Sequence, residues 1–201
     1  MDKGRASLRL TMDEEKMTIL FGLLQRGFPV EVPLGRSVAA VLCEEIGISR
    51  DYVEDRIQTI FLDGKAVDAI DSAIVESGST LALSAAMPGV VGATFRRGGH
   101  FAPMRAQITH HGEKGGASKE LGTFTLKLFN LVVKEIGPIF LERGVLVERE
   151  ILEQFLKDRS ADFLQACRSA EVNGAAVAID DLPRIHWPDG ESLICLQAVW
   201  E

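Results

Sequence analysis

Three of the four histidines lie close together in the middle of the chain, at His100, His110 and His111, and Glu113 follows them. Imidazole and carboxylate groups are ligands that suit zinc or nickel. Adjacent histidines point apart in an extended chain, however, and no helical i, i+4 pair supports a chelating site. We therefore interpret this segment as a solvated loop, with a metal site at the three histidines as the alternative, and we expect no cofactor.

Carboxylate pairs at Asp68/Asp71 and Asp180-Asp181 have the chemistry for metal binding or for general acid–base catalysis. Both pairs follow predicted turns, which favours exposed connections over a site. The cysteines are far apart, have apolar neighbours and form no C-x-x-C motif, which indicates small buried hydrophobes: Cys43, Cys167 and Cys195. No Ser/His/Asp order stands out, so we expect no catalytic residues.

A glycine pair, Gly98-Gly99, follows two arginines and precedes His100. One hypothesis is that a protease cuts after Gly99 and exposes a flexible tail that ends in two glycines. The alternative is a glycine hinge between two domains, with the arginines kept at the surface.

Large apolar residues precede this pair in a segment that glycines and a proline predict to be irregular: Met87, Pro88, Val90, Val91 and Phe95. Exposed apolar patches usually mark contacts with other molecules. The segment either packs between two modules or forms a docking strip for a partner protein.

Periodicity and capping signals predict the elements that position these residues. In the first half they indicate a strand at 7–11, a helix capped by Thr11 and ending at Gly27, an edge strand at 28–33, a helix capped by Ser37, a strand at 57–62, a turn at Asp63-Gly64 and a strand at 79–86. In the second half they indicate strands at 101–109, 123–128, 145–147 and 192–199, a helix at 130–142 kinked by Gly137-Pro138, a helix at 148–157 and a turn at Asn173-Gly174.

The order of these elements recurs in the two halves. An Asx-Gly turn and a later Gly-x-Ser/Thr-Leu motif also appear once in each half. We therefore predict two modules, at 1–99 with a connector at 87–99, and at 100–201.

Composition indicates an ordinary water-soluble globular chain, with 46% hydrophobic and 25% charged residues and a net charge of −7. Neither half is basic, so a nucleic-acid backbone or an anionic membrane is an unexpected main partner. The chain shows no apolar leader or membrane-length apolar run. We expect a cytoplasmic protein.

The second half resembles the small sulfur-carrier proteins of the ubiquitin-like β-grasp fold, the small subunit of molybdopterin synthase and the thiamine-pathway sulfur carrier. The resemblance rests on Leu126-Lys-Leu-Phe-Asn130, Val172-Asn-Gly174 and Asp189-Gly-Glu-Ser-Leu193. The first half is similar through Asp63-Gly64 and Gly78-Ser-Thr-Leu81. The resemblance implies an α+β protein of two tandem ubiquitin-like β-grasp modules, each a mixed sheet with helices packed on one face.

The family's chemistry needs a C-terminal Gly-Gly, whereas this sequence ends Ala198-Val-Trp-Glu201. We therefore expect a non-catalytic protein-interaction or scaffold protein with another protein as its partner. The alternative is a precursor of a sulfur carrier or protein modifier, activated by cleavage after Gly99. RNA-binding modules of the ribosomal S4 type use a phrase similar to Val-Asn-Gly, but they imply a basic face that this half lacks. An enzyme would need a cleft between the modules, lined by His100, His110 or the acidic pairs.

Overall fold

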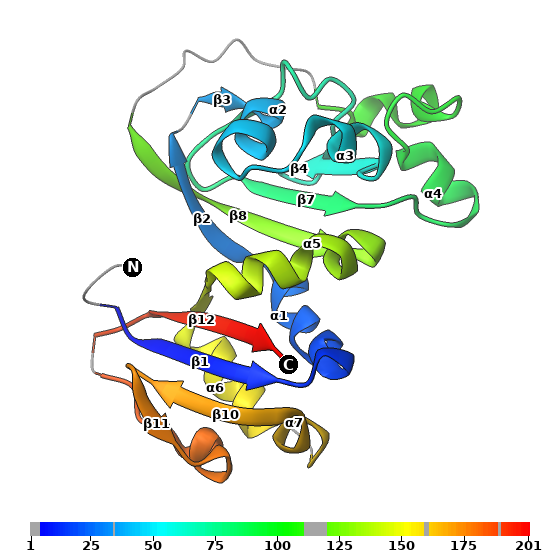
Figure 1. Ribbon diagram of the computed structural model, residues 1–201. Helices are drawn as coiled ribbons and strands as arrows, with labels where there is room; N and C mark the ends of the chain where they lie inside the picture. Colours follow the sequence, from blue (N-terminus) through cyan, green and yellow to red (C-terminus); the bar gives the residue numbers. More distant parts are fainter. Residues whose placement is uncertain (1–4, 34, 111–119, 159–160, 189) are drawn as a thin grey trace. The chain divides into compact units, whose positions relative to one another are not determined.

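The computed structural model describes residues 5–33, 35–110, 120–158, 161–188 and 190–201 (Figure 1). They form an α+β protein with mixed sheets. The chain divides into two compact units, of which unit 1 combines Met1–Phe28 with Lys134–Glu201 and unit 2 is Pro29–Val133. No helix in the described residues has both the length and the apolar character needed to cross a membrane.

Unit 1 is built around a five-stranded sheet in the order β11-β10-β1-β12-β9. Its elements are β1 (Ser7–Met12), the 3₁₀ helix η1 (Glu14–Leu20), α1 (Phe21–Arg26), β9 (Val145–Glu148), α6 (Arg149–Lys157), α7 (Ala161–Ala166), β10 (Cys167–Val172), β11 (Ala175–Val177), the 3₁₀ helix η4 (Ile179–Arg184) and β12 (Leu193–Trp200). The central strand β1 runs parallel to β12 and antiparallel to β10.

Unit 2 is built around a second five-stranded sheet in the order β2-β8-β7-β4-β5, with β3 and β6 forming a separate pair. Its elements are β2 (Phe28–Pro33), β3 (Arg36–Ser37), α2 (Val38–Ala40), the π-helical turn η2 (Val41–Glu45), α3 (Arg50–Asp55), β4 (Thr59–Leu62), β5 (Lys65–Ala66), β6 (Ile74–Val75), β7 (Thr80–Ser84), α4 (Gly89–Phe95), the 3₁₀ helix η3 (Ala102–Ile108) and β8 (Leu121–Phe129). Helix α5 (Asn130–Arg143) begins in unit 2 and continues into unit 1.

The two sheets share one pairing scheme. An edge hairpin, β4–β5 or β10–β11, pairs antiparallel with a central strand, β7 or β1, and that strand runs parallel to a neighbour, β8 or β12. The turn residues match as well, because Asp63 and Asn173 both have positive φ and each precedes a glycine of positive φ. Asp63 accepts a hydrogen bond from the Thr80 backbone N–H at 2.7 Å.

Asn173 accepts the equivalent bond from the Ser7 backbone N–H at 2.8 Å. Ser7 opens β1 and Thr80 opens β7, so β1 of unit 1 corresponds to β7 of unit 2. This correspondence differs from the repeat read in the sequence, in which the strand at 7–11 matches the strand at 123–128. The boundary predicted between residues 99 and 100 also differs from the division into units, because β8 joins the sheet of 29–133 and β1 joins the sheet of 134–201. Backbone pairing between strands far apart in sequence decides both points.

Local capping follows side-chain chemistry. Ser37 and Ser49 accept hydrogen bonds from the backbone N–H groups of Ala40 and Tyr52, as expected for N-cap serines. The first helix is capped by Asp13 and not by Thr11, because β1 extends through Met12. Helix α5 runs on through Pro138, where the sequence predicts a kink or break.

Each sheet buries one face through the alternation of its strands. In unit 1, Leu8, Leu10 and Met12 of β1 are fully buried. In unit 2, alternate residues of β4, β7 and β8 are buried together: Ile60, Leu62, Leu81, Leu83, Phe124, Leu126 and Leu128. The residues between them point to the opposite face of the unit 2 sheet, and that face carries the candidate site.

Candidate functional site

The second face of the unit 2 sheet is hollow where small residues of β7 lie between aromatic residues of its neighbours. Ala82 and Ser84 alternate with the buried Leu81 and Leu83, so their side chains lie on this face. The strand register places Phe61 of β4 opposite Ala82. It places Phe129 of β8 opposite Ser84. Two large rings beside two small side chains leave a depression along β7.

This depression is a pocket of about 330 Å³, at the small end of the range for ligand-binding pockets (~300–1,000 Å³). Six residues line it: Phe61, Ala82, Ser84, Met87, Phe129 and Asn130. Asn130 donates a hydrogen bond from Nδ2 to the Ser84 hydroxyl oxygen at 2.7 Å, so these two side chains form the polar part of an otherwise apolar lining. Asn130 has φ of 53°, a conformation that asparagine tolerates better than most residues.

Helix α4 follows β7 and borders this pocket, although the sequence predicts an extended connector over 87–99. Gly92 is buried against the backbone of Met87, and a Cβ at this position would lie 2.2 Å from the Met87 carbonyl oxygen. The Phe95 ring packs on Phe61, with ring centroids 5.2 Å apart. Only glycine, which has no side chain, allows the backbone at Gly92 to approach Met87 this closely. The glycine at this position therefore permits the helix.

Val90 and Val91 of α4 project into solvent, with 76% and 69% of their surface exposed. The strand predicted at 101–109 is wrong, because residues 102–108 form the 3₁₀ helix η3, which packs against α4. Around η3, Phe101, Met104 and Ile108 are also exposed. We call these five residues the apolar strip.

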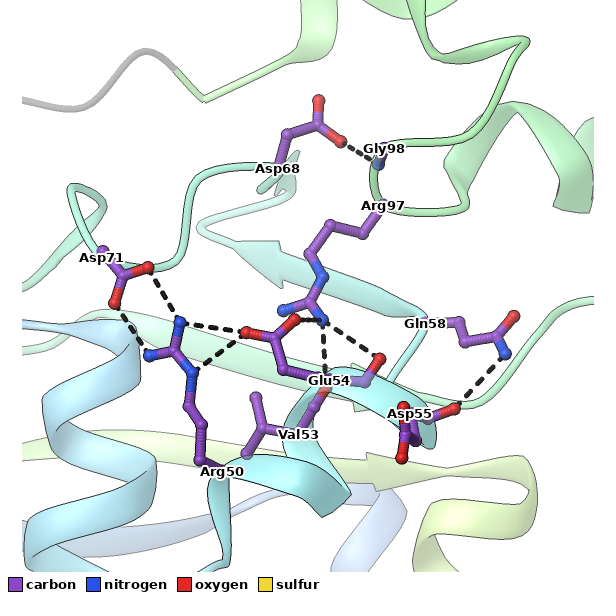
Figure 2. Close-up of polar contacts among 9 residues, drawn as sticks. All are labelled: Arg50, Val53, Glu54, Asp55, Gln58, Asp68, Asp71, Arg97 and Gly98. Atoms are coloured by element: carbon purple, nitrogen blue, oxygen red, sulfur yellow. Dashed lines mark hydrogen bonds and ion pairs between the residues drawn. The ribbon is translucent and has the colours of Figure 1, made fainter.

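Two arginines attach residues 87–109, the strip-bearing segment, to the rest of unit 2. Arg97 donates hydrogen bonds from Nη2 to the carbonyl oxygens of Val53 and Glu54 and pairs with the Glu54 carboxylate (Figure 2). These carbonyls belong to the last turn of α3, where helical backbone oxygens lack partners within the helix. The backbone N–H of Arg97 also donates to the carbonyl oxygen of Gln58 at 2.7 Å.

Arg105 is the buried anchor of the same segment, with only 4% of its surface exposed. Its guanidinium donates to the Thr94 carbonyl oxygen, the Thr109 hydroxyl and the Asp68 carboxylate at 2.6, 3.0 and 2.7 Å. Asp68 also accepts the backbone N–H of Gly98 at 3.0 Å (Figure 2). Burial alone would raise the pKa of Asp68, but these hydrogen bonds and the charges of Arg105 and Arg97 outweigh it and lower that pKa.

The predicted partner-binding residues fall at this surface. Met87 lines the pocket, Pro88 precedes α4 as an exposed N-cap, and Phe95 is half-buried against Phe61. The predicted tail residues Gly98 and Gly99 lie in a compact turn, in which the Gly99 N–H donates to the Arg96 carbonyl oxygen at 3.1 Å. That turn and the Asp68 contact give the glycine pair fixed partners in unit 2.

The predicted metal ligands are not brought together. His100 is exposed and packs edge-on against Phe101, whereas the backbone N–H of His110 donates to the carbonyl oxygen of Ala66. His111 lies outside the described residues, as do Glu113 and most of the predicted loop. Within the described ranges, no group of three His, Cys, Asp or Glu side chains is arranged to hold a metal ion.

Three of the four carboxylates in the predicted acidic pairs form ion pairs. Asp68 binds Arg105, as above, and Asp71 binds Arg50, which also pairs with Glu54 (Figure 2). Asp181 lies 3.7 Å from Arg184. Of the three cysteines predicted to be buried, Cys167 is buried, whereas Cys43 and Cys195 are half-buried. Desolvation raises the pKa of the Cys167 thiol to about 11, which keeps it protonated and unreactive.

Sequence reasoning missed the residues that shape the pocket and the residue that anchors the strip. In the sequence, Phe61 and Ala82 fall in predicted strands, Phe129 lies just after the strand predicted at 123–128, and nothing distinguishes Arg105. The pairing of β7 with β8 joins residues 80–84 to residues 125–129, and nothing local in the sequence signals this pairing.

A second pocket, of about 740 Å³, lies in unit 1 between β9, α6 and the start of β12. It is lined mainly by acidic side chains, of which Glu153 already pairs with Arg149 at 2.8 Å. Because the lining of this pocket is acidic and contains no buried side chain without a partner, we interpret the pocket as solvated surface.

Comparison of the chain with protein-family models, with curated proteins and with solved structures found no match.

Proposed function

We propose that this protein is a non-catalytic interaction protein that binds another protein through the apolar strip and the adjoining pocket. The observation that carries this proposal is the exposure of the strip, because Val90, Val91 and Met104 each leave more than two thirds of their surface in solvent. Contiguous exposed apolar surface mostly marks a contact site. The strip is also held in place, because Arg97 and Arg105 fix both of its helices to unit 2.

The same proposal includes the fold family. The shared pairing scheme of the two sheets, with a parallel central pair and an edge hairpin on an Asx-Gly turn, supports two ubiquitin-like β-grasp units that differ from sulfur carriers in strand connectivity. A cytoplasmic location belongs to the proposal as well.

The structure does not favour cleavage after Gly99, because a protease would have to open a turn held by three hydrogen bonds. The Gly98 N–H donates to the Asp68 carboxylate, the Gly99 N–H to the Arg96 carbonyl oxygen and the Ala102 N–H to the Gly99 carbonyl oxygen. Intact-mass analysis of the protein from its native cells tests this alternative directly. A species that persists uncleaved at Gly99 excludes the precursor, and a fragment ending at Gly99 would replace the proposed function.

Site-specific photo-crosslinking tests the proposed function. A benzophenone amino acid is placed at Val90 or at Met104 in the full chain and irradiated in the native cells. The expected result is one common crosslinked protein from both positions. A matched probe at Arg184, which is exposed in unit 1 away from the strip segment in sequence, is the control and should not yield that protein.

A second variant makes the result specific. Val91→Asp adds a charge to the strip at an exposed position, so the fold is preserved while apolar contact is lost. It should abolish the crosslink from Val90. If the crosslink persists in this variant, or if Arg184 yields the same product, the strip is not the binding surface.

A further inference from the structure

Lys127 lies beside the pocket, on the same face of the unit 2 sheet. The parallel register of β7 and β8 places Lys127 directly opposite Ala82, the residue at the floor of the pocket. Lys127 alternates with the buried Leu126 and Leu128, so its side chain leaves the sheet on the pocket side.

Lys127 has no carboxylate partner within the described part of the chain, although acidic residues outnumber basic ones by 29 to 22. Most arginines around the strip are paired, as Arg50, Arg97 and Arg105 show. The neighbouring edge strand β2 carries Glu31, an exposed residue that alternates with the buried Val32 and therefore lies on the Lys127 side of the sheet. Glu31 and Lys127 form no ion pair.

We propose that the pocket receives an acidic peptide segment of the partner, with one large apolar side chain in the pocket and an adjacent carboxylate on Lys127. This inference rests on the proposed function and names the chemistry of the partner. The walls formed by Phe61, Met87 and Phe129 accept an aromatic or long aliphatic side chain. The ammonium group of Lys127 provides the charge complementarity, and it selects against basic segments.

Two short peptides that differ only in charge test this inference. The probes are acetyl-Gly-Asp-Phe-Asp-Gly-amide and its isosteric Asn counterpart, acetyl-Gly-Asn-Phe-Asn-Gly-amide. Each is titrated into the ¹⁵N-labelled full chain, and the backbone amide shifts of Ala82, Ser84 and Asn130 are followed. Both peptides should shift these amides, and the Asp peptide should bind about threefold more tightly at low salt, as expected for one partly exposed ion pair.

Matched variants separate charge from packing. Lys127→Gln should bring the affinity ratio of the two peptides to about one, as should 1 M salt. Glu31→Gln removes a negative charge from the same face, so it should preserve or increase the ratio. Ala82→Leu fills the pocket floor and should abolish the shifts with both peptides.

The outcomes distinguish the two proposals. If both peptides bind with equal affinity to the wild-type chain, or if Lys127→Gln leaves their ratio unchanged, the acidic-segment inference is overturned and the proposed function stands. If neither peptide shifts the pocket amides while the strip crosslinks persist, the inference is again overturned and the partner uses the strip alone. Loss of the strip-specific crosslinks overturns the proposed function itself.

Discussion

Replacing Asp68 with alanine should loosen the strip-bearing segment 87–109, because Arg105 would keep a buried positive charge without its carboxylate. The side chain of Arg105 is 2% exposed and that of Asp68 is 34% exposed. Removing one partner of a fully buried ion pair costs about 3–5 kcal/mol. Because water reaches a third of the Asp68 side chain, we expect a smaller cost of about 2–3 kcal/mol, which is roughly a 30- to 150-fold increase in local opening.

Hydrogen exchange measured by mass spectrometry on peptides covering 87–109 reads this opening directly, since exchange follows the population of the open state when reclosing is fast. The matched control is Asp71→Ala, which breaks the exposed ion pair with Arg50. It should leave exchange in 87–109 within a few-fold of the wild-type chain.

A double variant tests the cause. Asp68→Ala combined with Arg105→Met removes the buried charge along with its partner, and apolar replacement of a buried pair is often close to neutral. Exchange should therefore be slower than in Asp68→Ala alone. The reasoning is refuted if Asp68→Ala exchanges no faster than the Asp71 control, or if the double variant exchanges faster than the single one.

Three further expectations follow. The pKa of Asp68 is lowered on folding, so its stabilising effect is full above the unfolded value of about 3.9 and is lost as pH falls through the lower folded pKa. A pH titration of the Gly98 amide shift should therefore have its midpoint below that unfolded value, and a midpoint at or above it would contradict the expectation. Gly92→Ala should disrupt α4 more than Gly89→Ala does, judged by proteolysis of the segment. A Cβ at Gly92 meets a backbone oxygen at 2.2 Å, whereas one at Gly89 meets open space and the only cost there is the strain of its positive φ of 81°. Asn173→Ala should destabilise unit 1 by about 2 kcal/mol and Asn173→Gly by about 1, because both lose a hydrogen bond and only alanine is strained at positive φ. Urea unfolding followed by tryptophan fluorescence checks this, since both tryptophans lie in unit 1, and equal losses would contradict the strain contribution.

The elements that local chemistry dictates could be predicted from the sequence. The turns at Asp63-Gly64 and Asn173-Gly174 and the cap at Ser37 depend on residues within four positions of one another, and the structure confirms them. The strand at 28–33 was also expected at a sheet edge because of its prolines, and β2 lies at the end of its sheet.

The remainder depends on contacts between distant residues. The composition of 87–99 favours an extended connector, yet α4 forms because Phe95 packs on Phe61 and Arg97 reaches the end of α3. The apolar character of Val90 and Val91 is evident from the sequence, but their exposure is not, because packing between two modules is an equally open interpretation of this segment. The pocket could not be predicted, because it requires the register that sets Ser84 beside Phe129.

The placement of β1 has a consequence for synthesis of the protein. This strand is made long before its two neighbours in the sheet, because β10 and β12 lie more than 150 residues later in the sequence. At about 5–20 residues per second, its apolar face waits roughly 10–40 s for the second neighbour. All of unit 2 is synthesised within that interval. We therefore expect Leu8, Leu10 and Met12 to form the segment of the nascent chain that most depends on chaperone protection.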